Sequence, residues 1–255
     1  MSDDQLGAGP EAGVPGAQAG EDDLQDSGTD YPQVPNQKGR FPAVGHGLVF
    51  NSKEGETITG AFRARLSWDD LESPENIVIH LGAFLVGENS KVPVGNPYYS
   101  VHHDNDRSKD GSTERSGRRR HGSKPSEEIL TVNVGWINRD VARVVLIAYI
   151  QDANPLTHTF GDLVNGKVVF SHRIEPMDPS ANTEEFGDFG TDAGAHVLDS
   201  DYYEGLTVVV MGELHRRAKD ETDPLNKVWT YRNIGRGYAD LVDVGEMYGV
   251  TFIAG

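Results

Sequence analysis

Apolar and polar residues alternate along several segments of the chain, a pattern typical of β-strands with one buried face. The alternation runs over residues 57–68 and again over 130–136. Apolar runs at 77–86, 144–150 and 206–211 are continuous and short, as in strands covered on both faces. In the first segment the apolar residues fall on alternate positions, and these are Ile58, Phe62, Ala64, Leu66 and Trp68. The pattern predicts a mostly β domain, a β-sandwich.

Two local signals add detail to this prediction. The dipeptide Asn165-Gly166 stands between Leu163-Val164 and the segment from Lys167 to Phe170, and it predicts a tight β-hairpin. Apolar residues at helical spacing predict one C-terminal helix over 238–248, which ends before Gly249. The three tryptophans lie on apolar strand faces and are expected in the core: Trp68, Trp136 and Trp229.

The ends and insertions differ in composition from this core. Residues 1–37 contain no Lys or Arg and little to bury, so residues 1–47 are predicted to be an acidic arm, disordered or ordered by a partner. The sandwich domain then spans 48–255, with an inserted acidic loop at 176–199. The net charge of −17 disfavours nucleic acid as a partner.

The chain has no cysteine, which excludes disulfides and thiolate chemistry. Its first residues lack the basic and apolar regions of a secretion signal, and no apolar run reaches the roughly 20 residues of a membrane span. The sequence therefore predicts a cytoplasmic protein without a membrane span.

The C-terminal third contains two distinctive segments, VVVMGELHRR (208–217) and KVWTYRNIGRGYADLVDVGEMYGV (227–250). Two further segments lie upstream, AFLVGENSKVP (83–93) and KDGSTERSG (109–117). Together these motifs resemble those of the TerD-like tellurium-resistance and stress-response family. The resemblance covers about 48–252. It implies a β-sandwich with calcium-binding loops at one end, a role in tolerance to tellurite and other stress, and no established enzymatic activity.

The calcium ligands that the resemblance implies are largely replaced. The family's Asp-x-Asp-x-Asp run falls on Asn76, Val78 and His80, and its acidic loop falls on three consecutive arginines, Arg118, Arg119 and Arg120. A guanidinium group repels a nearby divalent ion. A degenerate site is therefore expected.

Oxygen ligands nevertheless remain on either side of those arginines. From Asp106 the chain follows the early positions of an EF-hand loop, but Gly117 stands where the bidentate Glu belongs. Calcium binding, if present, is expected to be weak, and the alternative is an ordinary Asp/Ser/Gly turn. Zinc on His102, His103 and His121 is disfavoured, because adjacent histidines on an extended chain point apart. The candidate metal ligands are Asp104, Asn105, Asp106, Asp110, Glu114, Glu127 and Glu128.

The arginines Arg118, Arg119 and Arg120 have two interpretations. They form a solvated loop, or they bind a protein partner, for example the acidic arm of the same or a neighbouring subunit.

Three functions follow from these observations. The first is a non-catalytic TerD-like binding or scaffolding protein without a cofactor. The second is a structural or decoration component of a large assembly, such as a phage virion or a contractile machine. The third, a hydrolase that uses carboxylates at the loop end, has the least support. Glu213 and His215 could also exchange protons, but no nucleophile accompanies them.

Overall fold

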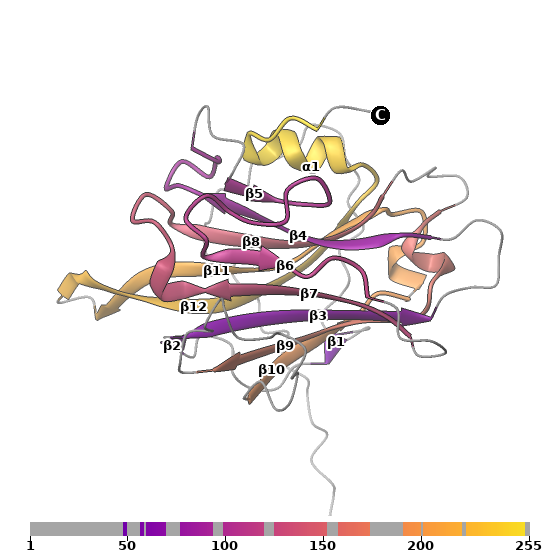
Figure 1. Ribbon diagram of the computed structural model, residues 1–255, viewed down its shortest axis with the longest axis horizontal. Helices are drawn as coiled ribbons and strands as arrows, with labels where there is room; N and C mark the ends of the chain where they lie inside the picture. The colour runs from indigo at the N-terminus through magenta and orange to yellow at the C-terminus, as the bar shows by residue number, and fades with distance from the viewer. Residues whose placement is uncertain are drawn as a thin grey trace, which may run out of the picture. The chain divides into compact units, whose positions relative to one another are not determined.

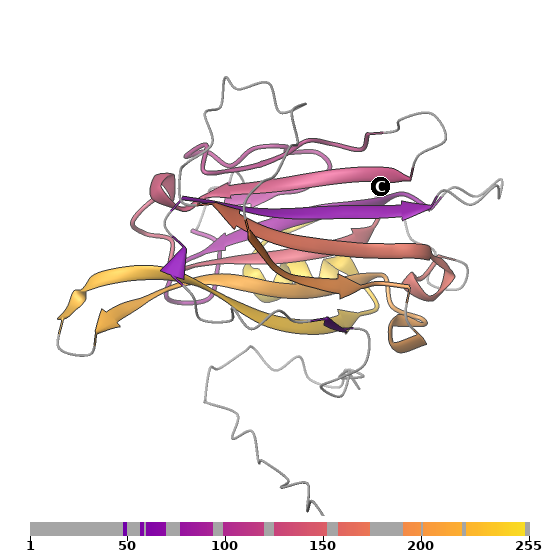
Figure 2. The same cartoon turned by 90° about the horizontal axis from the view of Figure 1, so that it is seen from below.

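The computed structural model of the protein describes residues 48–49, 57–58, 60–69, 77–93, 99–119, 125–151, 158–173, 191–199, 201–220 and 223–252. The predicted acidic arm, residues 1–47, lies outside this part of the chain. The described strands form two six-stranded sheets that face each other as two layers (Figure 1; Figure 2). The predicted fold class, a mostly β sandwich, is confirmed.

Every strand pairs antiparallel with its neighbours. In sheet order, the first sheet contains β1 (Leu48–Val49), β10 (Thr191–Val197), β9 (Val164–Arg173), β3 (Ala61–Asp69), β7 (Ser126–Asn133) and β6 (Thr113–Arg115). The second contains β2 (Thr57–Ile58), β12 (Asp223–Tyr238), β11 (Val208–Asp220), β8 (Arg143–Ile150), β4 (Ile79–Val86) and β5 (Ser100–Val101). Short 3-10 helices lie at Val134–Trp136, Phe160–Asp162 and Asp201–Tyr203.

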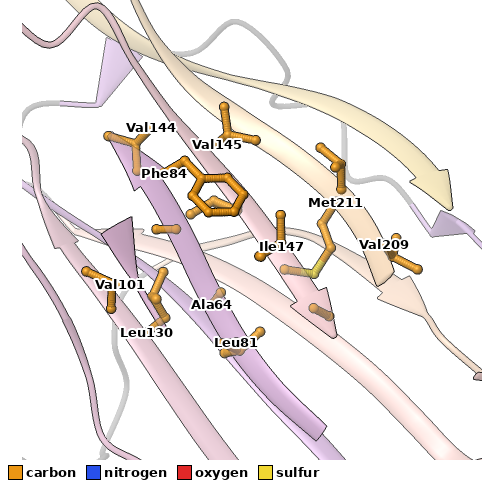
Figure 3. Close-up of a cluster of buried hydrophobic side chains, with 14 of the residues drawn as sticks. Ala64, Leu81, Phe84, Val101, Leu130, Val144, Val145, Ile147, Val209 and Met211 are labelled. Carbon is orange, nitrogen blue, oxygen red and sulfur yellow. The ribbon is translucent and has the colours of Figure 1, made fainter. Parts of the chain in front are cut away.

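The core lies between the sheets. Ala64 and Leu130 of the first sheet are buried against the layer that carries Leu81, Ile147 and Met211 (Figure 3). Burying an aliphatic side chain of this size stabilises a fold by roughly 1.5–3 kcal/mol. This shared interior explains why the apolar runs at 77–86 and 144–150 had to form strands.

Strand β4 is buried at all of its positions because its outer face is covered as well. The single α-helix among the described residues, α1 (Leu241–Tyr248), lies over this face (Figure 1). The ring of Phe84 stacks on that of Tyr248, with the ring centroids 5.2 Å apart. Lys91 donates hydrogen bonds from Nζ to the last carbonyls of the helix, at Glu246 and Met247.

The predicted helix is confirmed, with a later start. Tyr238 still belongs to β12, and the helix begins after Asp240, whose carboxylate accepts a hydrogen bond from the Val242 amide at 2.7 Å. Its end agrees with the prediction, since Gly249 has φ 75° and closes the helix in the left-handed conformation.

The predicted hairpin at Asn165-Gly166 is wrong, because both residues lie inside the continuous strand β9. Between the pairs Ser67–Lys167 and Asp69–Val164, β9 contains two residues and β3 contains one. The dipeptide therefore forms a β-bulge, and Asn165 takes φ 54°, a left-handed conformation that asparagine tolerates. The Asn-Gly dipeptide indicates a residue with a positive φ, and a β-bulge accommodates such a residue as well as a hairpin turn does.

The predicted loop at 176–199 is wrong for the residues from 191 onward. Residues 176–190 lie outside the described part, but Thr191–Val197 forms β10 and pairs with β9. His196 and Leu198 are fully buried. Glycine, alanine and histidine in this stretch conceal the apolar periodicity that would have indicated a strand.

The prediction for the tryptophans holds for Trp68 and Trp229, which are 1% and 7% exposed, but fails for Trp136, which is 36% exposed. The alternation ends with β7 at Asn133, and the chain then turns into a 3-10 helix that presents Trp136 to solvent. No helix in the described part of the chain is both long and apolar enough to cross a membrane.

Candidate functional site

A fully buried carboxylate joins the two sheets at one side of the sandwich. Glu128 lies on β7 with the same parity as Leu130, so its side chain points inward. Its Oε1 accepts a hydrogen bond from the Leu81 amide at 2.9 Å, and its Oε2 lies 2.8 Å from Nδ1 of His80. Strand β5 pairs with β4 at Ala83 and Phe84. Glu128 therefore binds the part of the β4 edge that lies beyond that pairing.

A buried guanidinium group balances the charge of this carboxylate. Arg115 on β6 donates from Nη1 to Oε1 of Glu128 at 3.1 Å and from Nε to Oδ1 of Asp106 at 2.6 Å. The Arg115 side chain is 5% exposed and that of Asp106 is 63% exposed. Removing either partner of a buried pair leaves an uncompensated charge. We call Glu128, Arg115, Asp106 and His80 the Glu128 network.

His80 connects this network to the outer face of the second sheet. Its Nε2 lies 2.8 Å from Oε1 of Gln151, so both ring nitrogens have oxygen partners. The ring packs beside Tyr149, its pairing partner on β8, and stacks on His103 with the ring centroids 5.8 Å apart. Burial raises the pKa of the Tyr149 hydroxyl, which therefore stays protonated.

Residues 102–105 form a tight turn on this outer face, which we call the histidine turn. The backbones of His102 and Asn105 exchange two hydrogen bonds of 3.0 Å, and the Asn105 amide group donates to the Ser100 carbonyl. The assumption that His102 and His103 lie on an extended chain and point apart is wrong. Because the chain turns here, their ring centroids are 5.7 Å apart.

Asp110 holds a separate turn. Its Oδ1 accepts hydrogen bonds from the Ser108 hydroxyl and from the amide and hydroxyl of Ser112, and its Oδ2 accepts one from the Asn138 amide. Burial alone would raise the pKa of Asp110, but the hydrogen bonds from Asn138, Ser112 and Ser108 outweigh it and lower the pKa. With Gly111 at φ 70°, these are the contacts of the Asp/Ser/Gly turn.

The seven predicted metal ligands are thus dispersed among several partners. Of these seven, Asp106 and Glu128 are brought together, through Arg115. Glu127 points to the opposite face of β7 from Glu128 and lies 3.5 Å from Nε of Arg65. The others contact different groups: Asp104 lies beside His103, Asn105 and Asp110 bind their own turns, and Glu114 lies 3.9 Å from Arg107.

Two of the three predicted partner-binding arginines contact the first residues of β7. Arg118 donates to the Ser126 hydroxyl and places its guanidinium carbon 5.5 Å from the centre of the Trp68 ring. Arg119 forms an isolated β-bridge with Glu127 through two backbone hydrogen bonds. Arg120 lies outside the described residues.

Sequence reasoning missed the central role of Arg115. Its partner could have been inferred in part, because Glu128 shares the parity of Leu130 and Val132 and must face the interior. A buried carboxylate needs a cation or several donors. The sequence offers many cations, and the pairing of β6 with β7 selects Arg115 among them.

Glu213 forms a second buried ionic cluster, on β11. It is 2% exposed and lies 3.3 Å from Nη1 of Arg143 and 3.1 Å from Nη2 of Arg232. Burial raises the pKa of Glu213, and Arg143 opposes this effect. His215 lies within hydrogen-bond distance of the Thr230 hydroxyl. Each of these groups is thus held by a partner within the fold.

The fold is a two-layer antiparallel β-sandwich with a buried carboxylate–arginine network at one side. Residues 52–243 match the model of the TerD domain, and the chain belongs to the TerD domain family. The fold is also similar to two solved structures. One is SCO6318 from Streptomyces coelicolor A3(2), a homologue of the telluride resistance protein TerD: TM-score 0.51 and 21% identity over 73% of this chain and 95% of that chain.

The other is SAV2460, a protein of unknown function, with a TM-score of 0.50 and 20% identity over 73% of this chain and 94% of that chain. At these identities the likeness concerns the fold. No curated protein sequence matches the chain.

Proposed function

We propose that this protein is a non-catalytic binding or scaffolding protein of the TerD stress-response type whose fold does not depend on calcium. The observation that supports this proposal is the Glu128 network, in which Arg115 supplies the positive charge that the carboxylates require. The ion-paired Glu213 supports the non-catalytic assignment in the same way, because both of its oxygens are held by arginines.

Calcium would have to compete with that guanidinium group. Calcium takes six to eight oxygen ligands, and here Glu128 and Asp106 already bind Arg115. A divalent ion about 4 Å from a guanidinium group is opposed by roughly 8 kcal/mol at an effective dielectric constant of about 20. Binding would therefore require that Arg115 leave its buried position.

We expect the melting temperature of the metal-stripped protein to be the same with and without excess calcium chloride. A ligand that binds the folded state alone must raise stability, so an unchanged melting temperature indicates that no calcium binds. Differential scanning calorimetry together with calcium titration calorimetry checks this. A rise in melting temperature that Asp106→Asn or Glu128→Gln abolishes would contradict the proposal.

For the binding role, we propose that the acidic arm and the arginines at 118–120 pair between copies of the chain or with a protein partner. The arm carries several acidic residues and residues 1–37 contain no Lys or Arg, whereas the arginines are consecutive. Such a contact is electrostatic and weakens as the ionic strength rises.

Deleting residues 1–37 is expected to remove a salt-sensitive association. Light scattering coupled to size exclusion should show a larger mass for the full chain at low salt than at high salt, and one mass for the truncated chain at both. The matched variant Arg118→Gln/Arg119→Gln/Arg120→Gln should behave as the truncated chain does. Equal masses for the full and truncated chains at low salt would count against this contact. A single large mass at every salt concentration would favour the alternative, a component of a large assembly.

A further inference from the structure

The histidine turn brings together three side chains that can bind a metal ion. One ligand atom from each of His102, His103 and Asp104 lies within 4.8 Å of the others. Nε2 of His103 is 3.1 Å from Oδ2 of Asp104, a usual separation for two ligands of one ion. We propose that these three residues form a binding site for an imidazole-preferring divalent transition-metal ion, with Zn²⁺ as the ion to test.

The backbone of the site is fixed before any ion arrives. Two backbone hydrogen bonds close the turn between His102 and Asn105, and the Asn105 side chain ties it to Ser100 on β5. A turn held in this way keeps the three ligands close together, so binding requires small side-chain rotations in place of chain ordering.

The orientation of His103 is set by neighbours beneath it. The Tyr149 hydroxyl oxygen accepts a hydrogen bond from the His103 amide at 2.8 Å and lies 3.0 Å from Nδ1 of the same residue. The His80 ring stacks against the other side. A metal-binding histidine commonly uses its second ring nitrogen in such a contact, which directs Nε2 toward the ion.

His102 and Asp104 complete a site that is open to solvent. The ring of His102 meets the edge of Phe252 with the centroids 5.3 Å apart, and the Asp104 side chain is 74% exposed. The nearby guanidinium group of Arg115 has its charge balanced by Asp106 and Glu128.

The donor set selects the class of ion. Two imidazole nitrogens and one carboxylate suit zinc, nickel, cobalt or copper, whereas calcium prefers a shell of oxygens. Three protein ligands leave a fourth position for water or for a group from a partner. The site therefore differs in its donor atoms from the oxygen-rich calcium site that the family resemblance implied, and the two have Asp104 in common.

The inference is tested by titrating the full-length, metal-stripped chain with Zn²⁺ in a calorimeter and repeating the titration with Ca²⁺. We expect one Zn²⁺ per chain, no heat with Ca²⁺, and a melting temperature about 5 °C higher at a hundredfold excess of Zn²⁺ over its Kd. Asp104→Asn, an exposed change that leaves the fold intact, should weaken Zn²⁺ at least about tenfold. His103→Gln should weaken it further.

The matched controls are His158→Gln and His121→Gln, which should bind Zn²⁺ as the parent chain does. Loss of binding in either control, or unchanged binding in Asp104→Asn and His103→Gln, would overturn the assignment, as would the absence of a Zn²⁺ heat and a melting shift. Because the Zn²⁺ and Ca²⁺ titrations are separate, failure here is distinguishable from failure of the calcium-independent fold proposed above.

Discussion

Replacing Glu128 with glutamine is expected to lower the free energy of unfolding by about 3–5 kcal/mol, the usual cost of breaking a buried ion pair. The amide oxygen of the new side chain could still accept the hydrogen bond from the Leu81 amide, but Arg115 would lose its buried counter-charge. Urea denaturation followed by tryptophan fluorescence measures the change.

The neighbouring residue supplies the control. Glu127→Gln removes a partly exposed carboxylate paired with an exposed Arg65, and should cost less than about 1 kcal/mol. Arg115→Met combined with Glu128→Gln should cost less than the sum of the two single changes, because the two residues are coupled. Equal losses for Glu127→Gln and Glu128→Gln would show that the Glu128 network does not stabilise the fold.

The second large effect is a loss of stability in mild acid, caused by His196. Burial lowers the pKa of His196 to about 4 from its usual 6.5, and the neighbouring Asn233 side chain and Met211 backbone offset this in part. The unfolded chain therefore takes up a proton at a pH where the folded chain does not. The contribution of neutral His196 to the free energy of unfolding is fully present above pH 6.5. It is lost as the pH falls from 6.5 to 4, by about 3 kcal/mol in total.

Most of this loss should be visible between pH 7 and pH 5, as about 2 kcal/mol in urea unfolding. The variant His196→Gln should be less stable at pH 7 but should show a shallower dependence on pH. The control is Phe170→Leu, which changes the ring that packs against His196 at a centroid distance of 5.5 Å. That control should lower the free energy of unfolding about equally at pH 7 and at pH 5. If the free energy of unfolding of His196→Gln fell with pH as steeply as that of the wild type, the acid sensitivity would not be due to His196.

The alternation of apolar residues was sufficient to predict the sandwich. In both sheets the apolar positions of the alternating strands face the interior and are buried. In β3 the positions of Phe62, Leu66 and Trp68 are buried as expected. The hairpin prediction failed because one local preference is compatible with two structures. Asn165 favours a positive φ, and a bulge inside β9 satisfies that preference as well as a hairpin would.

The candidate site was less accessible to sequence reasoning. The carboxylates were recognised as candidate ligands, but their partners come from other strands: Arg115 from β6 and His80 from β4. Spacing along the chain does not determine such contacts, because the register between sheets is a property of the packed core. Likewise, the contact between the rings of His102 and His103 depends on a turn that the local sequence does not predict.

The contact between Glu128 and the Leu81 amide has a further consequence for self-assembly. An exposed strand edge offers unpaired N–H groups to which a strand of another molecule can add, which is a route to aggregation. The Leu81 amide lies beyond the short pairing of β5 with β4, and an internal carboxylate already occupies it. A buried side chain thus protects the margin of this sheet from edge-to-edge polymerisation.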